Sequence, residues 1–282
     1  MIQKNKARPG RPVINKKNSG QVQSLYRGLA LLEKIADAQS GILLTDLAEQ
    51  LDLPASTTHR LLNTLEGQGF VRREPSQELW FIGTTGFKIG NAFLASRDFV
   101  RQSESFMQEL VAQVGETSNL SILQNGQALI IAQQQCSEMM RMMVPLGSCS
   151  PLHASGVGKA IMAALPQIER DQQVAQLTLQ SITPWTVTCK DELRKILSQT
   201  AEQQWALDDQ EHAIGLRCVA ACLYDEKSYP LAAISVSGPL ARIDDQRVLL
   251  LGEKVKQTAM LITDFIGGKW PAKQNVLESK EL

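Results

Sequence analysis

Three residues whose side chains can carry out nucleophilic catalysis occur in the second half of the chain: His153, Ser155 and Asp208. A serine can attack a carbonyl carbon when a histidine accepts its proton and a carboxylate orients that histidine. His153 and Ser155 are two residues apart, so both can project the same way from one strand or loop. The flanking His-Ala-Ser-Gly sequence, however, lacks the Gly-x-Ser-x-Gly elbow that exposes a nucleophilic serine. We therefore expect no catalytic residues and keep a small-molecule hydrolase using Ser155 and His153 as the alternative function.

Residues 156–159 (GVGK) resemble part of a loop that binds nucleotide phosphates. The full pattern needs a glycine where His153 stands and a serine or threonine, to hold magnesium, where Ala160 stands. We therefore expect no nucleotide, no metal and no other cofactor. Ser155 instead fits the N-cap of a helix that begins at Gly156, and the free amides of such a first turn favour a carboxylate.

A third set of polar residues lies on one side of a helix predicted over residues 55–68. Its apolar side is predicted to face the core through Thr58, Leu61, Leu62 and Leu65. The opposite side, at spacings of three and four residues, carries no acid and consists of Ser56, His59, Arg60 and Asn63. An arginine can bind guanine with two hydrogen bonds and an asparagine can do the same with adenine, while Ser56 or Thr57 can contact phosphates. Taken alone, the set could equally be a solvated helix face.

The neighbouring segments favour the nucleic-acid interpretation. Leu25, Leu29, Leu32 and Ala36 recur with helical spacing and predict an amphipathic helix over residues 24–37. A short helix is predicted over residues 46–51, with Thr45 as its N-cap. Residues 70–81 read as two strands around a Pro-Ser turn, and Arg72 and Arg73 in this hairpin could contact flanking phosphates. Three helices followed by a hairpin predict a winged helix-turn-helix.

The first twenty residues carry six basic side chains and no acid, although the whole chain balances 29 basic against 29 acidic residues. Proline and glycine in this segment disfavour a helix, so an extended basic arm is expected. Such an arm, with Arg8 among its basic residues, suits the DNA backbone, and Arg11 between Gly10 and Pro12 could enter a narrow minor groove. A solubilising tail is the alternative. Taken with the predicted winged helix, the arm makes duplex DNA the leading partner.

The composition is that of a folded, soluble protein with about two domains in its 282 residues. Apolar residues make up 43% and charged residues 21%, which excludes wholesale disorder. No apolar stretch approaches the ~18 residues of a membrane helix. No membrane partner is therefore expected, and a cytoplasmic location is expected because no apolar segment follows the positive charges near the N-terminus. The five cysteines are an odd number without zinc-ligand spacing, so free thiols are expected.

Six segments, in order along the chain, resemble the IclR family of bacterial transcription regulators. They are residues 20–29 (GQVQSLYRGL), 53–62 (LPASTTHRLL), 68–72 (QGFVR), 151–160 (PLHASGVGKA), 208–218 (DDQEHAIGLRC) and 232–239 (AAISVSGP). The resemblance covers nearly the whole chain. It implies a repressor that assembles as a dimer, or as a pair of dimers, through its first helix and a linker helix. It also implies a GAF-like (profilin-like) second domain that binds a small effector.

By the same resemblance, Gly156 and Val157 supply an amide cradle for a small keto- or hydroxy-acid. The remaining positions that the family implies for the effector site are polar Asp208, Cys218, Ser235 and Ser237 and apolar Met139, Met142 and Leu216. Closely similar members carry leucine in place of Ser150 and alanine in place of Val157, so the resemblance also implies a changed pocket wall.

The expected fold class is α+β, with an N-terminal winged helix-turn-helix domain and a C-terminal GAF-like α/β effector-binding domain. The expected boundaries are a flexible basic arm at 1–22, the winged helix at 23–83, a linker helix at 84–100, the effector domain at 101–267 and a tail at 268–282. The expected partners are double-stranded operator DNA, a small carboxylate effector and further copies of the chain.

Overall fold

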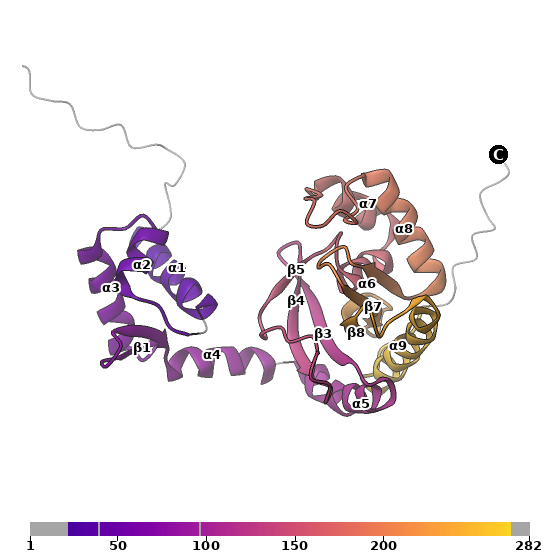
Figure 1. The fold of residues 1–282 in the computed structure, drawn as a ribbon, viewed down its shortest axis with the longest axis horizontal. Coiled ribbons are helices and arrows are strands. Elements are labelled where there is room, and N and C mark those ends of the chain that lie inside the picture. Colours follow the sequence, from indigo (N-terminus) through magenta and orange to yellow (C-terminus); the bar gives the residue numbers. More distant parts are fainter. Residues whose placement is uncertain (1–21, 39, 96, 272–282) are drawn as a thin grey trace, which may run out of the picture. The chain divides into compact units, whose positions relative to one another are not determined.

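The computed structural model describes residues 22–271 except Gln39 and Ser96, and it consists of two compact units, Met1–Ala95 and Ser96–Leu282 (Figure 1). The predicted basic arm, including Arg8 and Arg11, lies outside the described residues, as does the tail after residue 271. Among the helices of the described part, none combines the length and the apolar character needed to cross a membrane.

The first unit is a winged helix-turn-helix, as predicted. Its elements are α1 (Gln23–Asp37), α2 (Leu44–Gln50), α3 (Ala55–Gly67), β1 (Val71–Glu74), β2 (Leu79–Ile82) and α4 (Thr84–Ala95). The two strands form an antiparallel hairpin, the wing. Its small core consists of Leu31, Ile35, Ile42, Leu47, Leu62, Val71 and Trp80.

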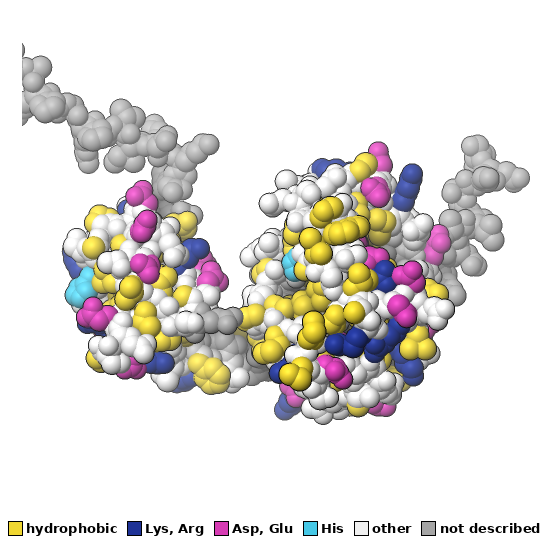
Figure 2. All heavy atoms as spheres, viewed as in Figure 1, with side chains coloured by type: hydrophobic (Ala, Val, Ile, Leu, Met, Phe, Trp, Pro, Cys, Tyr) yellow, Lys and Arg dark blue, Asp and Glu magenta, His cyan; other side chains and the backbone are white. Residues whose placement is uncertain are grey.

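Helix α1 forms where its periodicity predicts it, but the apolar face found from the sequence is not the buried one. Leu25 and Leu29 are 61% and 52% exposed, whereas Gly28, Leu31 and Ile35 face the core. Tyr26 is 61% exposed as well. We call Leu25, Tyr26 and Leu29 the α1 stripe. Figure 2 shows hydrophobic side chains at the surface of both units.

The predicted N-cap of α2 is wrong. The helix begins at Leu44 with Leu43 as its N-cap, and no side chain caps it. The Thr45 hydroxyl instead donates to the neighbouring Asp46 carboxylate at 3.3 Å. In α3, Thr58 and Leu62 are buried, as the predicted core stripe requires.

The second unit is a six-stranded antiparallel sheet with helices on both faces. Its strands run in the order β5-β4-β3-β8-β7-β6. The elements are α5 (Asp98–Val114), β3 (Thr117–Gln124), β4 (Gln127–Gln134), β5 (Cys149–Pro151), α6 (Gly156–Ala164), α7 (Gln167–Gln176), α8 (Lys190–Gln203), β6 (Ala206–Asp209), β7 (Leu216–Tyr224), β8 (Pro230–Pro239) and α9 (Asp245–Phe265). Helices α5 and α9 cover one face, and α6 covers the other beneath α7 and α8 (Figure 1). This is the α+β fold expected from the sequence.

Helix α6 packs closely against the sheet because its first turn carries glycines. A Cβ added at Gly158 would lie 2.4 Å from the Cα of Leu152, a distance that no side chain tolerates. Buried apolar side chains continue the contact, among them Ala160 and Ile161 on the helix and Ala220 and Ala233 on the sheet. The N-terminus of α6 is thereby fixed against the central strands.

Two features of this unit differ from the sequence-based expectation. The strand-like sequence of residues 139–145 predicts a strand next to those at 119–124 and 128–134. This prediction is wrong, because the segment has no regular structure and Ser150, within β5, pairs with Ala128 of β4 instead. Strand β6 was not predicted; it is four residues long, too short to show a clear alternation.

Candidate nucleic-acid interface and ligand site

The outward face of α3 presents the side chains predicted to contact DNA. Ser56, His59, Arg60 and Asn63 are exposed, and Thr57 is half-buried. Asn63 Nδ2 lies 3.4 Å from His59 Nδ1, so these two side chains are in contact with each other. In the described part of the chain, the Arg60 guanidinium makes no ion pair and is available to an acceptor on DNA.

The arginines of the wing have partners within the wing. Arg73 donates to Glu78 at 2.7 Å, and Arg72 lies 3.7 Å from Glu74 and 4.6 Å from the centre of the Phe81 ring. A phosphate contact at either arginine therefore has to replace an exposed ion pair, which contributes little stability.

In the second unit, Ser155 is the N-cap of α6, as predicted. Its hydroxyl accepts a hydrogen bond from the Gly158 amide at 3.2 Å, and its carbonyl accepts one from the Lys159 amide at 3.0 Å. The first-turn amides of Gly156 and Val157 have no such partner among the described residues. These two amides form the candidate anion cradle.

The sheet brings the predicted polar residues to the cradle. A Cβ added at Gly156 would lie 2.9 Å from the Cys218 carbonyl oxygen and 3.1 Å from its Sγ. Cys218 pairs with Ser237 on one side and with Asp208 on the other, and cross-strand partners share a face. Ser235 lies two residues before Ser237 and therefore faces the same way. All four side chains are buried.

Asp208 is 2% exposed and is held by the loop that follows β6. Its Oδ1 accepts hydrogen bonds from the amides of Glu211 at 2.8 Å and His212 at 3.3 Å, while Oδ2 makes none to any residue the structure describes. The pKa of Asp208 is raised to about 7, chiefly by burial; nearby Lys159 and the two amide hydrogen bonds oppose this rise, and Glu211 adds to it.

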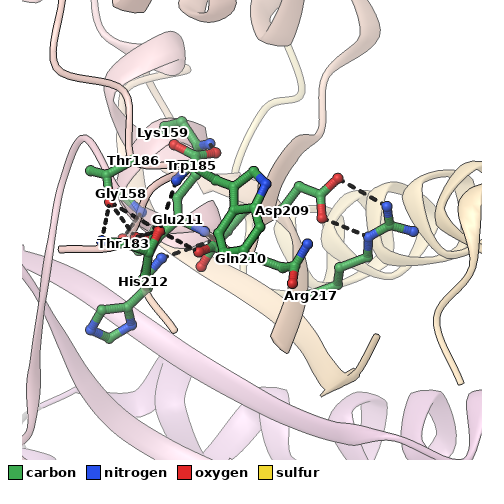
Figure 3. A network of polar contacts seen from close by, with 12 residues as sticks. Gly158, Lys159, Thr183, Trp185, Thr186, Asp209, Gln210, Glu211, His212 and Arg217 are labelled. Atoms are coloured by element: carbon green, nitrogen blue, oxygen red, sulfur yellow. Dashed lines mark hydrogen bonds and ion pairs between the residues drawn. The ribbon is translucent and has the colours of Figure 1, made fainter. Parts of the chain in front are cut away.

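A buried ion pair between Lys159 and Glu211 lies near the Asp208 carboxyl group. Lys159, 1% exposed, donates to Glu211 Oε1, while Glu211 Oε2 is buried without a partner among the residues described (Figure 3). The hydroxyls of Thr183 and Thr186 donate to the carbonyls of Gln210 and Glu211, each at 2.7 Å, and fix the loop. Without Glu211, the ammonium group of Lys159 would be a buried charge lacking its ion-pair partner.

Two further titratable groups lie near Asp208 and remain neutral above pH 7. The pKa of the Cys218 thiol is raised to about 11, chiefly by burial. Asp208 contributes to this rise, while Ser237, Ser235 and Lys159 oppose it. Burial lowers the pKa of His212.

The hydrolase alternative finds no support in this geometry. The Ser155 hydroxyl donates to the Pro151 carbonyl at 2.7 Å, and His153 Nε2 lies 3.0 Å from the Gln180 carbonyl. The proton of Ser155 is therefore directed to a backbone oxygen rather than to a base that could accept it.

Three predicted apolar wall positions are not part of the buried cluster. Met139 is 98% exposed, Met142 is half-buried in the same irregular segment, and Leu216 is half-buried at the start of β7. The two positions at which the resemblance implies a changed pocket wall are both buried: Val157 packs into the apolar cluster beneath α6, and Ser150 lies in β5.

The sequence interpretation did not include Glu211 or the role of Lys159. Their partnership joins residues 52 positions apart, which no local pattern reveals. One signal was present: Lys159 is the only charged residue in α6, an otherwise apolar helix, and a buried lysine needs a partner.

A winged helix-turn-helix followed by a separate sheet domain places the chain among DNA-binding transcription regulators. Residues 24–75 match the IclR helix-turn-helix domain, and residues 91–264 match the bacterial transcriptional regulator IclR C-terminal family. The chain belongs to the IclR family, as the sequence resemblance indicated.

Two relatives and one solved structure illustrate the similarity. The chain is 44% identical over 252 residues to the transcriptional repressor IclR of Escherichia coli strain K12, across 89% of this chain and 92% of that protein. It is 38% identical over 263 residues to the HTH-type transcriptional repressor AllR of Klebsiella pneumoniae, across 93% and 97%. An IclR homologue from Microbacterium hydrocarbonoxydans, complexed with 4-hydroxybenzoate, shares the fold with a TM-score of 0.75 and 19% identity, across 86% of this chain and 98% of that one.

Proposed function

We propose that this chain is a homodimeric repressor of a metabolic operon and that a small carboxylate controls its affinity for the operator. The helix α3 reads base edges through Arg60 and Asn63, and the basic arm at 1–22, with Arg8 and Arg11, adds phosphate contacts. The ligand binds in the second unit, so ligand and DNA do not compete for the same atoms.

The observation that carries the ligand proposal is the pair of free amides at the N-terminus of α6. Gly156 lies against Cys218 of β7, where its missing side chain brings the helix and strand backbones within contact distance. Free amides at the positive end of a helix favour an anion. The Ser235 and Ser237 hydroxyls and the Cys218 thiol supply further donors on the same face.

The cradle residues are all less than a tenth exposed, so a ligand can enter only when part of the unit moves. This requirement supports regulation by linkage: a ligand that binds one conformation better than another shifts the population toward it. The named relatives are repressors, and one solved homologue holds a carboxylate, which supports both the sign and the ligand class.

The dimer proposal is supported by the apolar surface of the first unit. The α1 stripe is more than half exposed, and Phe87 and Ile89 of α4 are 72% and 58% exposed. Exposed apolar groups of this kind are typical of an interface. Two copies of α3 would then bind two half-sites of one operator.

The test begins with genomic footprinting, which supplies an operator and neighbouring genes. Operator affinity is then measured with and without pyruvate, lactate and 4-hydroxybenzoate, and binding of each acid is measured by calorimetry. We expect Ser235→Ala to weaken acid binding by about 10- to 100-fold, since a hydrogen bond to a charged group contributes about 1.5–3 kcal/mol. Operator affinity without ligand should be unchanged.

Ser118→Ala is the matched control. Ser118 is a buried serine on neighbouring β3, but it pairs with Val236, so it faces away from Ser235 and Ser237. Its substitution should leave acid binding unaltered. Equal losses in the two variants would show that Ser235 acts only through packing, and absence of any acid binding would reject the ligand class.

A further inference from the structure

We propose, on the basis of the carboxylate ligand proposed above, that the site binds the acid together with one proton. Asp208 holds this proton. Ligand and proton then bind as a pair, and the response of the regulator depends on pH.

Asp208 is a buried carboxyl group without a counterion of its own. Its Oδ1 is engaged by two backbone amides, whereas Oδ2 has no hydrogen-bond partner in the described part of the chain. The nearby ammonium group of Lys159 donates to Glu211 (Figure 3). Among the described residues, it makes no hydrogen bond to Asp208. Lys159 and Glu211 together carry no net charge, so an ionised Asp208 leaves the cluster with one negative charge.

The anion cradle adjoins this negative charge. Asp208 pairs with Cys218 across the strands β6 and β7, and Cys218 lies directly against Gly156 of the cradle. An ionised ligand at the Gly156 and Val157 amides therefore brings a second carboxylate to a buried site that already contains one. Two carboxylates in such a site share a proton, because both cannot remain ionised at low cost. A protonated Asp208 can also donate a hydrogen bond through its free oxygen to the ligand.

Four other titratable groups face Asp208. They come from each element packed around it: Lys159 of α6, Glu211 and His212 of the following loop, and Cys218 of β7. The pKa shifts of Cys218 and His212 keep both of them neutral at pH 8.5. Burial raises the pKa of Asp208 to about 7, so without ligand this group is mostly ionised at pH 8.5 and mostly protonated at pH 6. Proton uptake on binding is therefore expected at the higher pH.

The test is calorimetry of the full chain with pyruvate, lactate and 4-hydroxybenzoate at pH 6 and pH 8.5, each in two buffers of different ionisation enthalpy. The buffer dependence of the heat gives the number of protons taken up. We expect close to one proton per bound acid at pH 8.5 and few at pH 6. Above pH 7.5 the affinity should fall about tenfold per pH unit, as uptake of one proton requires.

Asp208→Asn keeps an oxygen that can accept the two amide hydrogen bonds but cannot take up a proton. Its acid binding should be nearly independent of pH and without proton uptake. Asp209→Asn is the matched control, because Asp209 is the next residue and binds Arg217 instead. It should retain the wild-type proton uptake.

The outcomes separate this inference from the function on which it rests. Acid binding to the wild-type chain without proton uptake at pH 8.5 overturns the inference and leaves the carboxylate ligand in place. Proton uptake that persists in Asp208→Asn assigns the proton to another group and also overturns it. If none of the three acids binds at either pH, the proposed ligand class fails and the inference fails with it.

Discussion

Replacing Asp208 with asparagine should make the second unit more stable above pH 7, although it removes a charged group. Burial raises the pKa of Asp208 from 3.8 in the unfolded chain to about 7 in the folded chain. The stability that comes with the raised pKa is fully present below pH 3.8 and is lost as pH rises through 7. A shift of roughly three units, at about 1.36 kcal/mol each, gives an upper limit of about 4 kcal/mol.

The assay is urea unfolding of the full chain between pH 4 and pH 8.5, followed by tryptophan fluorescence. The second unit holds three of the four tryptophans, Trp185, Trp205 and Trp270, so its transition dominates the signal. Asp208→Asn should unfold at higher urea than wild type at pH 8.5, and the gap should close toward pH 4. A difference in unfolding free energy that is constant with pH, or that grows as pH falls, would refute the reasoning.

Three further predictions concern DNA contacts and the buried ion pair. Arg60→Ala should keep its fold and lose about 1–3 kcal/mol of discrimination between operator and scrambled DNA; a wild-type ratio in a binding titration would show that Arg60 does not read bases. Deleting residues 1–19 should weaken operator binding and flatten its dependence on salt by roughly 0.9 for each phosphate that the arm neutralises, whereas unchanged salt plots would exclude the arm from the interface. Lys159→Met should destabilise the second unit by about 3–5 kcal/mol, as measured by urea unfolding, because it leaves Glu211 charged and buried. Adding Glu211→Gln should restore most of that stability, and a double variant as unstable as the single one would argue against the pair.

Local patterns predicted the helices and strands well and the surfaces they bury less well. The periodicity of α1 correctly predicts a helix, yet Leu31 and Ile35 rather than Leu25 and Leu29 meet the core. Both faces of this helix contain leucines, and the spacing alone does not say which face the rest of the unit covers. Tertiary packing makes that choice.

In the candidate ligand site, too, the local features could be predicted from the sequence and the long-range contacts could not. Ser155 could be predicted as a helix cap because the cap depends on residues three positions apart. The ion pair between Lys159 and Glu211 depends on a contact between α6 and the loop after β6, which exists only once the sheet has formed. The segment around Met139 was mistaken for a strand because strand propensity does not reveal whether a neighbouring strand is available for pairing.

The α1 stripe has a consequence for how the regulator responds to its own abundance. In the proposed dimer, apolar side chains that the second copy covers stabilise the assembled form only, so stability increases with protein concentration. Dilution would then separate protomers and, in the same step, remove the pairing of two α3 helices that the proposed binding to two half-sites needs. Occupancy of the operator would fall more steeply with dilution than a single binding equilibrium allows. The hydrophobic face of one short helix would thus set a threshold copy number per cell below which the operon is left unrepressed.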